Sequence, residues 1–223
     1  VLRQNHAQVI ALLVALAMLV FAFVQTDSAH AQADSFHVGN GTGGGFTASA
    51  GTTTHNHAAP ITAAASAGAS SVTIGTERTG AYSGVAGLAA NRLVLVIQST
   101  GFTGTATDGS PTAIDLTSNA VGRWELARVL SVTAPTVTFT SPLINSYTAT
   151  GAQIVTIPEF TTATIGLGNT VNGPAWDGAS GGYVGFLATG AVTVTGTLSA
   201  VGLGFRGGAI RNTTATGCAQ LVQ

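Results

Sequence analysis

The 223-residue sequence has little charge and no lysine. Only 7% of its residues are charged, its seven basic residues are all arginines, and the formal net charge is −1. Nucleic-acid binding depends on clustered lysine and arginine, so the composition excludes a nucleic-acid-binding protein. A charge-rich disordered chain and a coiled coil are excluded too, because both need charged residues in bulk. The abundance of glycine, threonine, alanine and valine is instead typical of a β-protein.

Cysteine is nearly absent as well. Cys218 is the only one, so no disulfide within the chain can stabilise the fold, which must depend on burial and backbone hydrogen bonds. Cys218 has three interpretations: a small buried hydrophobic residue, half of a disulfide with a partner outside this sequence, or a reactive or metal-binding thiol. No His or acid lies near it in the sequence, which disfavours the third.

The N-terminus is typical of a secretory signal peptide. Arg3 gives a short positive region, residues 9–24 form an unbroken apolar run, and Ala29 and Ala31 form a small-x-small cleavage site. The run is shorter than the roughly 20 apolar residues of a membrane-spanning helix. We therefore predict a signal peptide over residues 1–31, a mature chain that starts at Gln32, and no transmembrane span after cleavage. The predicted localisation is secreted or cell-surface.

The mature chain divides into three predicted zones. Residues 32–70 are a leader rich in Gly, Thr and Ala, with short strands around 46–48 and 60–61 and loops elsewhere. Residues 71–160 alternate β-rich runs with turn signals, which predicts a small β-barrel or sandwich-like module. The strands expected in this module are 71–74, 93–98, 124–132, 136–140 and 154–157. The run 93–98 is continuously apolar, as in a strand buried on both faces.

Residues 161–223 change rhythm. The apolar runs 183–188, 191–195 and 197–201 are separated by little more than single glycine corners. Hairpins would favour two-residue Asn-Gly or Asp-Gly turns, whereas these corners are typical of a β-solenoid. Solenoid coils bury their faces only against neighbouring coils. We therefore predict an all-β chain that ends in the first coils of a truncated β-solenoid (β-helix), whose open end favours self-association.

Three stretches of the mature chain carry a family resemblance. They are 36–53, with its Gly-Asn-Gly and Gly-Thr-Thr groups; 93–147, with Leu-Val-Leu-Val-Ile-Gln and Trp-Glu-Leu-Ala-Arg-Val; and 176–208, with Trp-Asp-Gly and the final Gly-rich run. In these the chain resembles the N-terminal region of large secreted bacterial surface proteins, namely adhesin-like and adventurous-gliding-motility-type β-helix proteins. The resemblance implies a surface or extracellular location and a structural or adhesive role, and it transfers no catalytic residue. Members of that group are usually much longer than this chain.

Two patterns associated with nucleotide binding or catalysis occur without the context they require. G-x-G-x-x-G appears at 39–44 and 202–207, but no helical pattern follows either match. Residues 178–182 fit G-x-S-x-G around Ser180, yet a strand pattern follows and every His lies at or before position 57. We interpret this stretch as a tight turn and predict no catalytic residue and no cofactor.

Polar side chains in the middle of the chain give no convincing metal site. His55 and His57 would share one face of a strand, but zinc needs further ligands, and we interpret them as part of a solvated polar loop. The aspartates in the polar insertion 99–119 are too sparse for calcium. Glu125 and Arg128 are interpreted as a structural ion pair. No metal ligand is predicted.

Aromatic residues of the third zone suggest a carbohydrate role. Trp176, Tyr183 and Phe205 cluster around Gly-rich turns and are candidate glycan-stacking residues, although packing is the commoner role of such side chains. Glycosidases need two facing carboxylates, and the third zone has only Asp177.

The sequence thus predicts an exported, non-enzymatic structural or adhesive protein. Its expected partners are surface polysaccharide or other cell-envelope components. The alternative is the N-terminal part of an extracellular carbohydrate-active β-helix enzyme whose catalytic coils are missing.

Overall fold

The computed structural model describes residues 38–48, 51–78, 87–102, 116–117 and 119–205, together with the backbone of 209–211 and 220–222. Every regular element in these ranges is a β-strand, which confirms the predicted all-β class. The predicted cleavage residues Ala29, Ala31 and Gln32 lie outside the described residues, as do Cys218 and most of the 99–119 insertion. Across the described ranges there is no helix long and apolar enough to span a bilayer.

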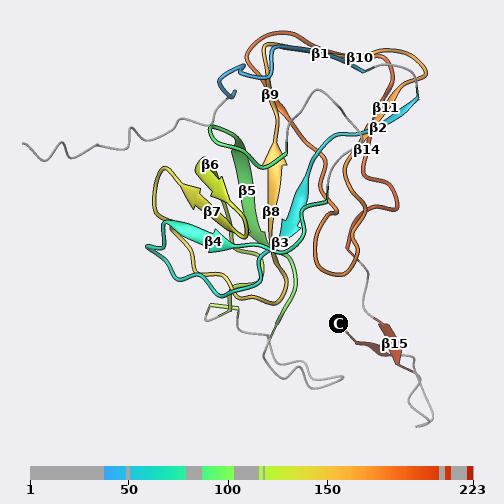
Figure 1. Cartoon of the computed structure of the whole chain (residues 1–223). Helices are drawn as coiled ribbons and strands as arrows, with labels where there is room; N and C mark the ends of the chain where they lie inside the picture. The colour runs from blue at the N-terminus through green and yellow to red at the C-terminus, as the bar shows by residue number, and fades with distance from the viewer. Residues whose placement is uncertain are drawn as a thin grey trace, which may run out of the picture. The chain divides into compact units, whose positions relative to one another are not determined.

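A curled six-stranded antiparallel sheet occupies the middle of the sequence (Figure 1). Its strands, in spatial order, are β3 (Ala58–Pro60), β8 (Ala152–Ile157), β5 (Leu93–Gln98), β6 (Trp124–Thr133), β7 (Thr136–Phe139) and β4 (Ser71–Thr73). Isolated bridges between Ile61 and Ile74 and between Ala58 and Arg78 link the two ends of this sheet. The strands predicted between 71 and 157 are therefore present, in one sheet that curls on itself.

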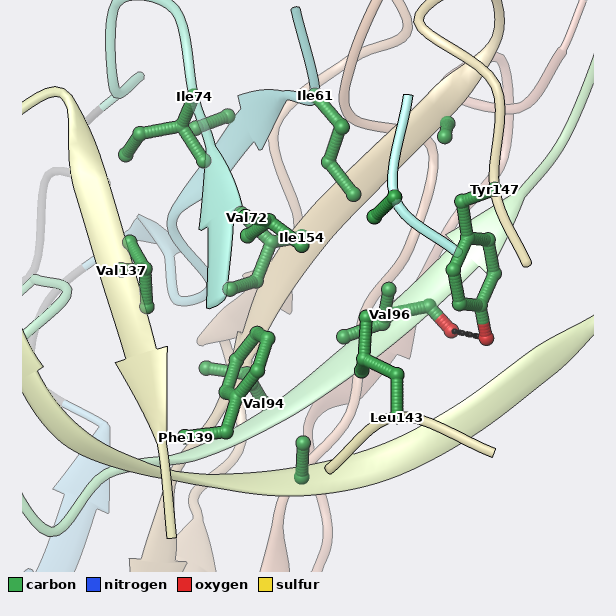
Figure 2. Packing of buried hydrophobic residues seen from close by; sticks show 14 of the residues in the cluster. Ile61, Val72, Ile74, Val94, Val96, Val137, Phe139, Leu143, Tyr147 and Ile154 are labelled. Atoms are coloured by element: carbon green, nitrogen blue, oxygen red, sulfur yellow. Dashed lines mark hydrogen bonds between the residues drawn. The ribbon is translucent and has the colours of Figure 1, made fainter. Parts of the chain in front are cut away.

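The interior of the curled sheet is a single apolar cluster (Figure 2). Its larger members are Ile61, Val72, Ile74, Val94, Val96, Val137, Phe139, Leu143, Tyr147 and Ile154. The central strand β5 pairs with β6 on one side and β8 on the other, and its consecutive residues Leu93 and Val94 are both fully buried. Because consecutive strand residues point to opposite faces, the predicted burial of this run on both faces is confirmed.

Glu125 and Arg128 do not pair with each other, so that prediction is wrong. The two residues are three positions apart on one strand, and side chains at that spacing point to opposite faces of the sheet. Glu125 is buried and accepts hydrogen bonds from the backbone N–H groups of Ile144 (2.8 Å) and Asn145 (2.9 Å) and from the Tyr147 hydroxyl (3.0 Å). Burial, with the Glu125 carboxylate beside it, raises the pKa of Tyr147 above its usual value, so the hydroxyl stays a donor.

Arg128 instead binds Glu159, which lies in a different group of strands. Its Nη1 and Nη2 atoms donate to the two carboxylate oxygens at 2.7 and 3.0 Å, a bidentate pair whose two side chains are largely buried. The same carboxylate accepts a hydrogen bond from the backbone of Asn40 at 3.0 Å. This buried ion pair connects the six-stranded sheet with the start of β9 and with the chain before β1.

The structure also has three short parallel sheets, two of which combine strands from the early and late parts of the described chain, as β1 and β10 do in Figure 1. They are β1 (Gly45–Ala48) with β10 (Thr162–Ile165) and β13 (Val192–Val194); β2 (Thr52–Thr54) with β11 (Thr170–Asn172) and β14 (Thr197–Ser199); and β9 (Glu159–Phe160) with β12 (Leu187–Ala188). The strands β9, β10 and β11 are followed by β12, β13 and β14, each of which pairs in parallel with its counterpart in the first series. The remaining pair, β15 (Ala209–Arg211) and β16 (Gln220–Val222), is antiparallel.

Several of these parallel strands differ from the prediction. The leader was expected to be loop around 52–54, but these residues form β2, and β10 and β11 were not expected as strands. The leader strand β1 pairs with β10, more than a hundred positions further along the sequence. A strand of three or four residues leaves little local pattern, because its partners rather than its own alternation decide where it forms. The three-zone division of the mature chain stays a prediction.

Candidate functional site

The candidate site lies in residues 173–186, which join β11 to β12 and contain neither helix nor strand. The segment folds back on itself, and the Gly182 N–H donates to the Pro174 carbonyl at 2.7 Å. Its glycines are required by this close approach. A Cβ at Gly173 would collide with the Tyr183 carbonyl, and Gly181 has a φ of +101° with the Ala175 carbonyl 2.5 Å from where a Cβ would lie. The glycines therefore allow the backbone of this loop to pack closely against itself.

Three aromatic side chains meet at this loop. The Phe205 ring centroid lies 4.7 Å from that of Trp176 and 5.4 Å from that of Tyr183, with interplanar angles of 71° and 66°. Both contacts are edge-to-face, the arrangement that aromatic quadrupoles favour. Trp176 and Tyr183 are half-buried and Phe205 is 38% exposed. The structure thus brings together the three predicted residues, called the aromatic cluster below, whereas their role in glycan stacking stays a prediction.

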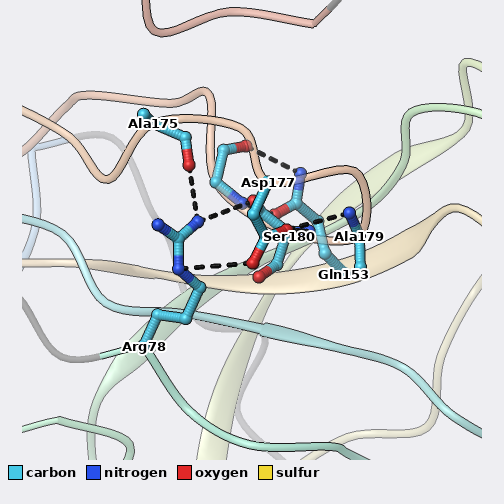
Figure 3. Close-up of polar contacts among 7 residues, drawn as sticks. Arg78, Gln153, Ala175, Asp177, Ala179 and Ser180 are labelled. Atoms are coloured by element: carbon cyan, nitrogen blue, oxygen red, sulfur yellow. Dashed lines mark hydrogen bonds and ion pairs between the residues drawn. The ribbon is translucent and has the colours of Figure 1, made fainter.

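Arg78 binds residues 175–180 of this loop (Figure 3). Its Nη1 donates to the carbonyls of Ala175 (2.5 Å) and Ser180 (3.1 Å), and its Nε lies 3.4 Å from a carboxylate oxygen of Asp177. The other Asp177 oxygen accepts the backbone N–H groups of Ala179 (2.9 Å) and Ser180 (2.8 Å). Burial works to raise the pKa of Asp177, but these N–H groups and Arg78 outweigh it and lower the pKa. The carboxylate is therefore charged and closes a tight turn, as predicted for 178–182.

Two buried side-chain amides hold the rest of the segment. Gln153 on β8 accepts the Gly181 N–H at 2.7 Å and donates to the Gly181 carbonyl at 3.0 Å. Asn56 accepts the Gly185 N–H at 3.1 Å and donates to the Gly185 carbonyl at 2.8 Å. Each amide therefore satisfies both polar groups of one backbone residue, as a neighbouring strand would.

No sequence motif marks the three residues that hold this segment. Arg78, Gln153 and Asn56 are single polar residues with no motif around them, and each reaches its partners across a large separation in sequence. The one available signal is Gln153 itself, since a polar residue within the largely apolar run of β8 needs a hydrogen-bond partner if it is buried.

Ser180 has no catalytic surroundings among the described residues. Its hydroxyl is buried without a hydrogen-bond partner there, while Arg78 binds its carbonyl. His57 binds Glu77 at 3.0 Å. The Nε2 atom of His57 and the Ser180 hydroxyl are both buried without a hydrogen-bond partner among the described residues, so they are not bonded to each other. The G-x-S-x-G match therefore brings no histidine to the serine.

The predicted solvated loop at His55 and His57 is wrong, because both side chains are buried. The His55 ring packs among Phe46, Phe160 and Phe186, with centroid distances of 4.8, 5.3 and 6.0 Å. Burial, with a smaller contribution from His57, lowers the pKa of His55 from 6.5 to about 4. Hydrogen bonding to His57 lowers the pKa of Glu77.

No group of three or more potential metal-ligating side chains is found in the part of the chain that the structure describes. The polar stretch 55–57 is buried because it lies between β2 and β3, which belong to two different sheets.

Comparisons with known proteins give distant structural similarity only. No family model and no curated protein matches the sequence. The chain is similar to the tailspike gp61 of Pseudomonas phage phi297 (TM-score 0.32, 14% identity, 65% of this chain and 21% of that one) and to the tailspike gp49 of Pseudomonas phage LKA1 (0.30, 14%, 66% and 23%). A third is the Gp54 tailspike of Acinetobacter baumannii bacteriophage AP22, solved with A. baumannii capsular saccharide (0.31, 12%, 70% and 26%). The chain spans about a quarter of their length, and at these TM-scores the similarity assigns no function.

Proposed function

We propose that the chain is part of an exported cell-surface or extracellular protein with a structural or adhesive role, which holds polysaccharide on the aromatic cluster. The observation that carries this proposal is the arrangement of Trp176, Tyr183 and Phe205. Phe205 is partly exposed and is supported edge-on by the other two rings. A supported ring offers an apolar face to the C–H groups of a sugar at little cost in conformational entropy.

The charges around the cluster favour a neutral glycan. Arg78 and Asp177 form the ion pair beside Trp176, and their charges cancel. The chain has no lysine and a formal net charge of −1, a composition that favours a neutral ligand over a polyanion. The ligand class that follows is a neutral polysaccharide of the cell envelope or its surroundings.

A β-solenoid and export complete the proposal. Parallel pairing of β9, β10 and β11 with β12, β13 and β14, in the same order, supports a stack of coils. The apolar run and the cleavage motif of residues 1–31 support export, and the resemblance to large secreted surface proteins supports the structural or adhesive role. The proposal is non-catalytic, since the aromatic cluster has one carboxylate beside it in the described chain, that of Asp177.

Affinity electrophoresis tests this function. The mature chain is run through native gels with hydroxyethylcellulose, xylan or dextran as neutral polysaccharides and with alginate as a polyanion. We expect retardation by at least one neutral polysaccharide, and about a tenfold weaker dissociation constant for Phe205→Ala. The matched control is Leu130→Ala, because Leu130 is an apolar residue of β6 that is 56% exposed.

Three results would change the conclusion. Equal retardation of Phe205→Ala and the unsubstituted chain would remove the cluster from the proposal. Retardation by alginate alone would contradict the ligand class. Release of reducing ends from the bound polysaccharide would favour the alternative, a carbohydrate-active enzyme.

A further inference from the structure

We propose that Gln153 and Asn56, with Arg78, are positioning residues that fix the aromatic cluster for its ligand. The inference rests on the proposed function, because it concerns how the same site is formed. Gln153 and Asn56 are both fully buried, and each makes a donor and an acceptor bond to one backbone residue of 173–186.

The backbone positions that these side chains bind lie on either side of Tyr183 and next to Trp176. Gln153 binds Gly181 and Asn56 binds Gly185, so Tyr183 lies midway between two fixed backbone positions. Trp176 follows Ala175, whose carbonyl accepts a hydrogen bond from Arg78. The backbone N–H of Trp176 also donates to the Leu203 carbonyl at 2.8 Å. This bond connects Trp176 to the segment that carries Phe205. Loosening these attachments would let the rings move apart without removing any of them.

Gln153 lies on a strand of the six-stranded sheet, Arg78 forms one of its closing bridges, and Asn56 lies in the segment that leads into β3. Gln153 precedes Ile154 on β8, and the two point to opposite faces, Ile154 into the apolar cluster and Gln153 toward Gly181. Asn56 also donates to the Thr156 carbonyl of β8 at 2.7 Å. Arg78 forms the bridge to Ala58. Residues 173–186 form no strand, so their backbone makes no hydrogen bonds of a β-ladder. The side-chain amides of Gln153 and Asn56 provide hydrogen bonds to this backbone instead. It follows that side chains outside the aromatic cluster hold the backbone that carries Trp176 and Tyr183.

The decisive variant is Gln153→Glu. It keeps the size of the side chain and an acceptor for the Gly181 N–H, but it replaces the donor to the Gly181 carbonyl with a carboxylate oxygen. The matched control is Gln98→Glu. Gln98 is a buried glutamine of the neighbouring strand β5, and its amide accepts the Thr148 N–H (2.8 Å) and donates to the Thr150 carbonyl (3.0 Å).

Two readouts are measured in a Trp124→Phe background. The chain has two tryptophans, so this leaves Trp176 as the only one. The first readout is acrylamide quenching of Trp176 fluorescence without ligand, and the second is gel retardation by the neutral polysaccharide that retards the unsubstituted chain. We expect Gln153→Glu and Asn56→Asp to raise the quenching constant about twofold and to weaken binding at least tenfold. Gln98→Glu is expected to leave both unchanged.

The outcomes separate this inference from the proposed function. If quenching rises in Gln153→Glu but the unsubstituted chain binds no polysaccharide, the positioning role stands and the proposed function fails. If Gln153→Glu keeps the β-type circular dichroism of the unsubstituted chain and both readouts stay the same, the positioning role is overturned. If Gln153→Glu does not fold, Arg78→Lys decides by the same two readouts, because Arg78 is partly exposed and its substitution leaves no buried carboxylate.

Discussion

His55 shows how the environment of one residue decides its chemistry. Its imidazole lies among Phe46, Phe160 and Phe186, where a charged ring would lose its hydration. The pKa is accordingly lowered from 6.5 to about 4. The folded chain therefore binds this proton more weakly than the unfolded chain, and the contribution of His55 to stability is complete above pH 6.5 and is lost as the pH falls toward 4.

The first prediction is an acid destabilisation that His55→Leu reduces. Between pH 6.5 and pH 5 the free energy of unfolding should fall by about 2 kcal/mol, at about 1.4 kcal/mol for each pH unit below 6.5. Urea unfolding at pH 8, 6.5 and 5 measures it. Glu77 adds little in this range, since its pKa is lowered and its contribution is lost only below its ordinary value of 4.5. An equal fall in the unsubstituted chain and in His55→Leu would contradict the assignment to His55.

Glu125 illustrates a buried carboxylate that is satisfied by donors. Two backbone N–H groups and the Tyr147 hydroxyl point at its oxygens. In Glu125→Gln one carboxylate oxygen becomes an NH2 group. This group would face one of the N–H or O–H donors that now bind Glu125. We expect a loss of about 2 kcal/mol or more in the free energy of unfolding, because a buried donor is left without an acceptor.

Asp177→Asn is the matched control for Glu125→Gln. Asp177 also accepts two backbone N–H groups, but its side chain is 43% exposed, so water can replace a lost bond. Its cost should be smaller than that of Glu125→Gln in the same urea titration. Equal costs would show that burial is not what makes Glu125 important.

At the scale of elements, the buried pair Arg128–Glu159 joins β6 to β9. Removing Arg128 leaves a buried carboxylate without its cation, a change that typically costs about 3–5 kcal/mol. Arg128→Met should therefore unfold at a much lower urea concentration than the unsubstituted chain. The double variant Arg128→Met, Glu159→Gln should recover part of the loss, since no charge is left buried. Arg92→Met serves as the control, because the described residues show no ion pair for Arg92. A double variant as unstable as Arg128→Met alone would contradict this account.

Whether a strand could be predicted from the sequence depends on how far away its pairing partners lie. Residues 93–98 are an apolar run between turn signals, and β5 begins and ends where the run does. The strand β2, in contrast, is Thr-Thr-Thr, and it pairs in parallel with β11, more than a hundred positions further along the sequence. Likewise, the three aromatics could be grouped by their nearness to glycines. The one local signal for Gln153 was its polarity within the apolar run of β8, and no local signal pointed to Asn56; their partners lie 28 and 129 positions away.

At the scale of the whole molecule, the parallel sheet β1-β10-β13 buries apolar side chains at one edge strand, β1, and exposes them at the other, β13. Register places Phe46, Ala163 and Val192 in one column and Ala48, Ile165 and Val194 in the next. The first two members of each column are buried, but Val192 is 50% and Val194 47% exposed. The exposed members belong to β13, an edge strand that has no further neighbour in its sheet among the described residues. An apolar, unpaired strand edge is a site for pairing with another chain.

We therefore predict that the mature chain associates with a second copy through β13 and β14. In sedimentation velocity the weight-average sedimentation coefficient should rise with protein concentration, and Val194→Lys should reduce this rise by placing a charge in the open column. Thr193→Lys is the matched control, because Thr193 lies on the same strand but in register with the exposed Thr164 on the opposite face. A sedimentation coefficient independent of concentration, or an equal effect of both lysine variants, would contradict association through this edge.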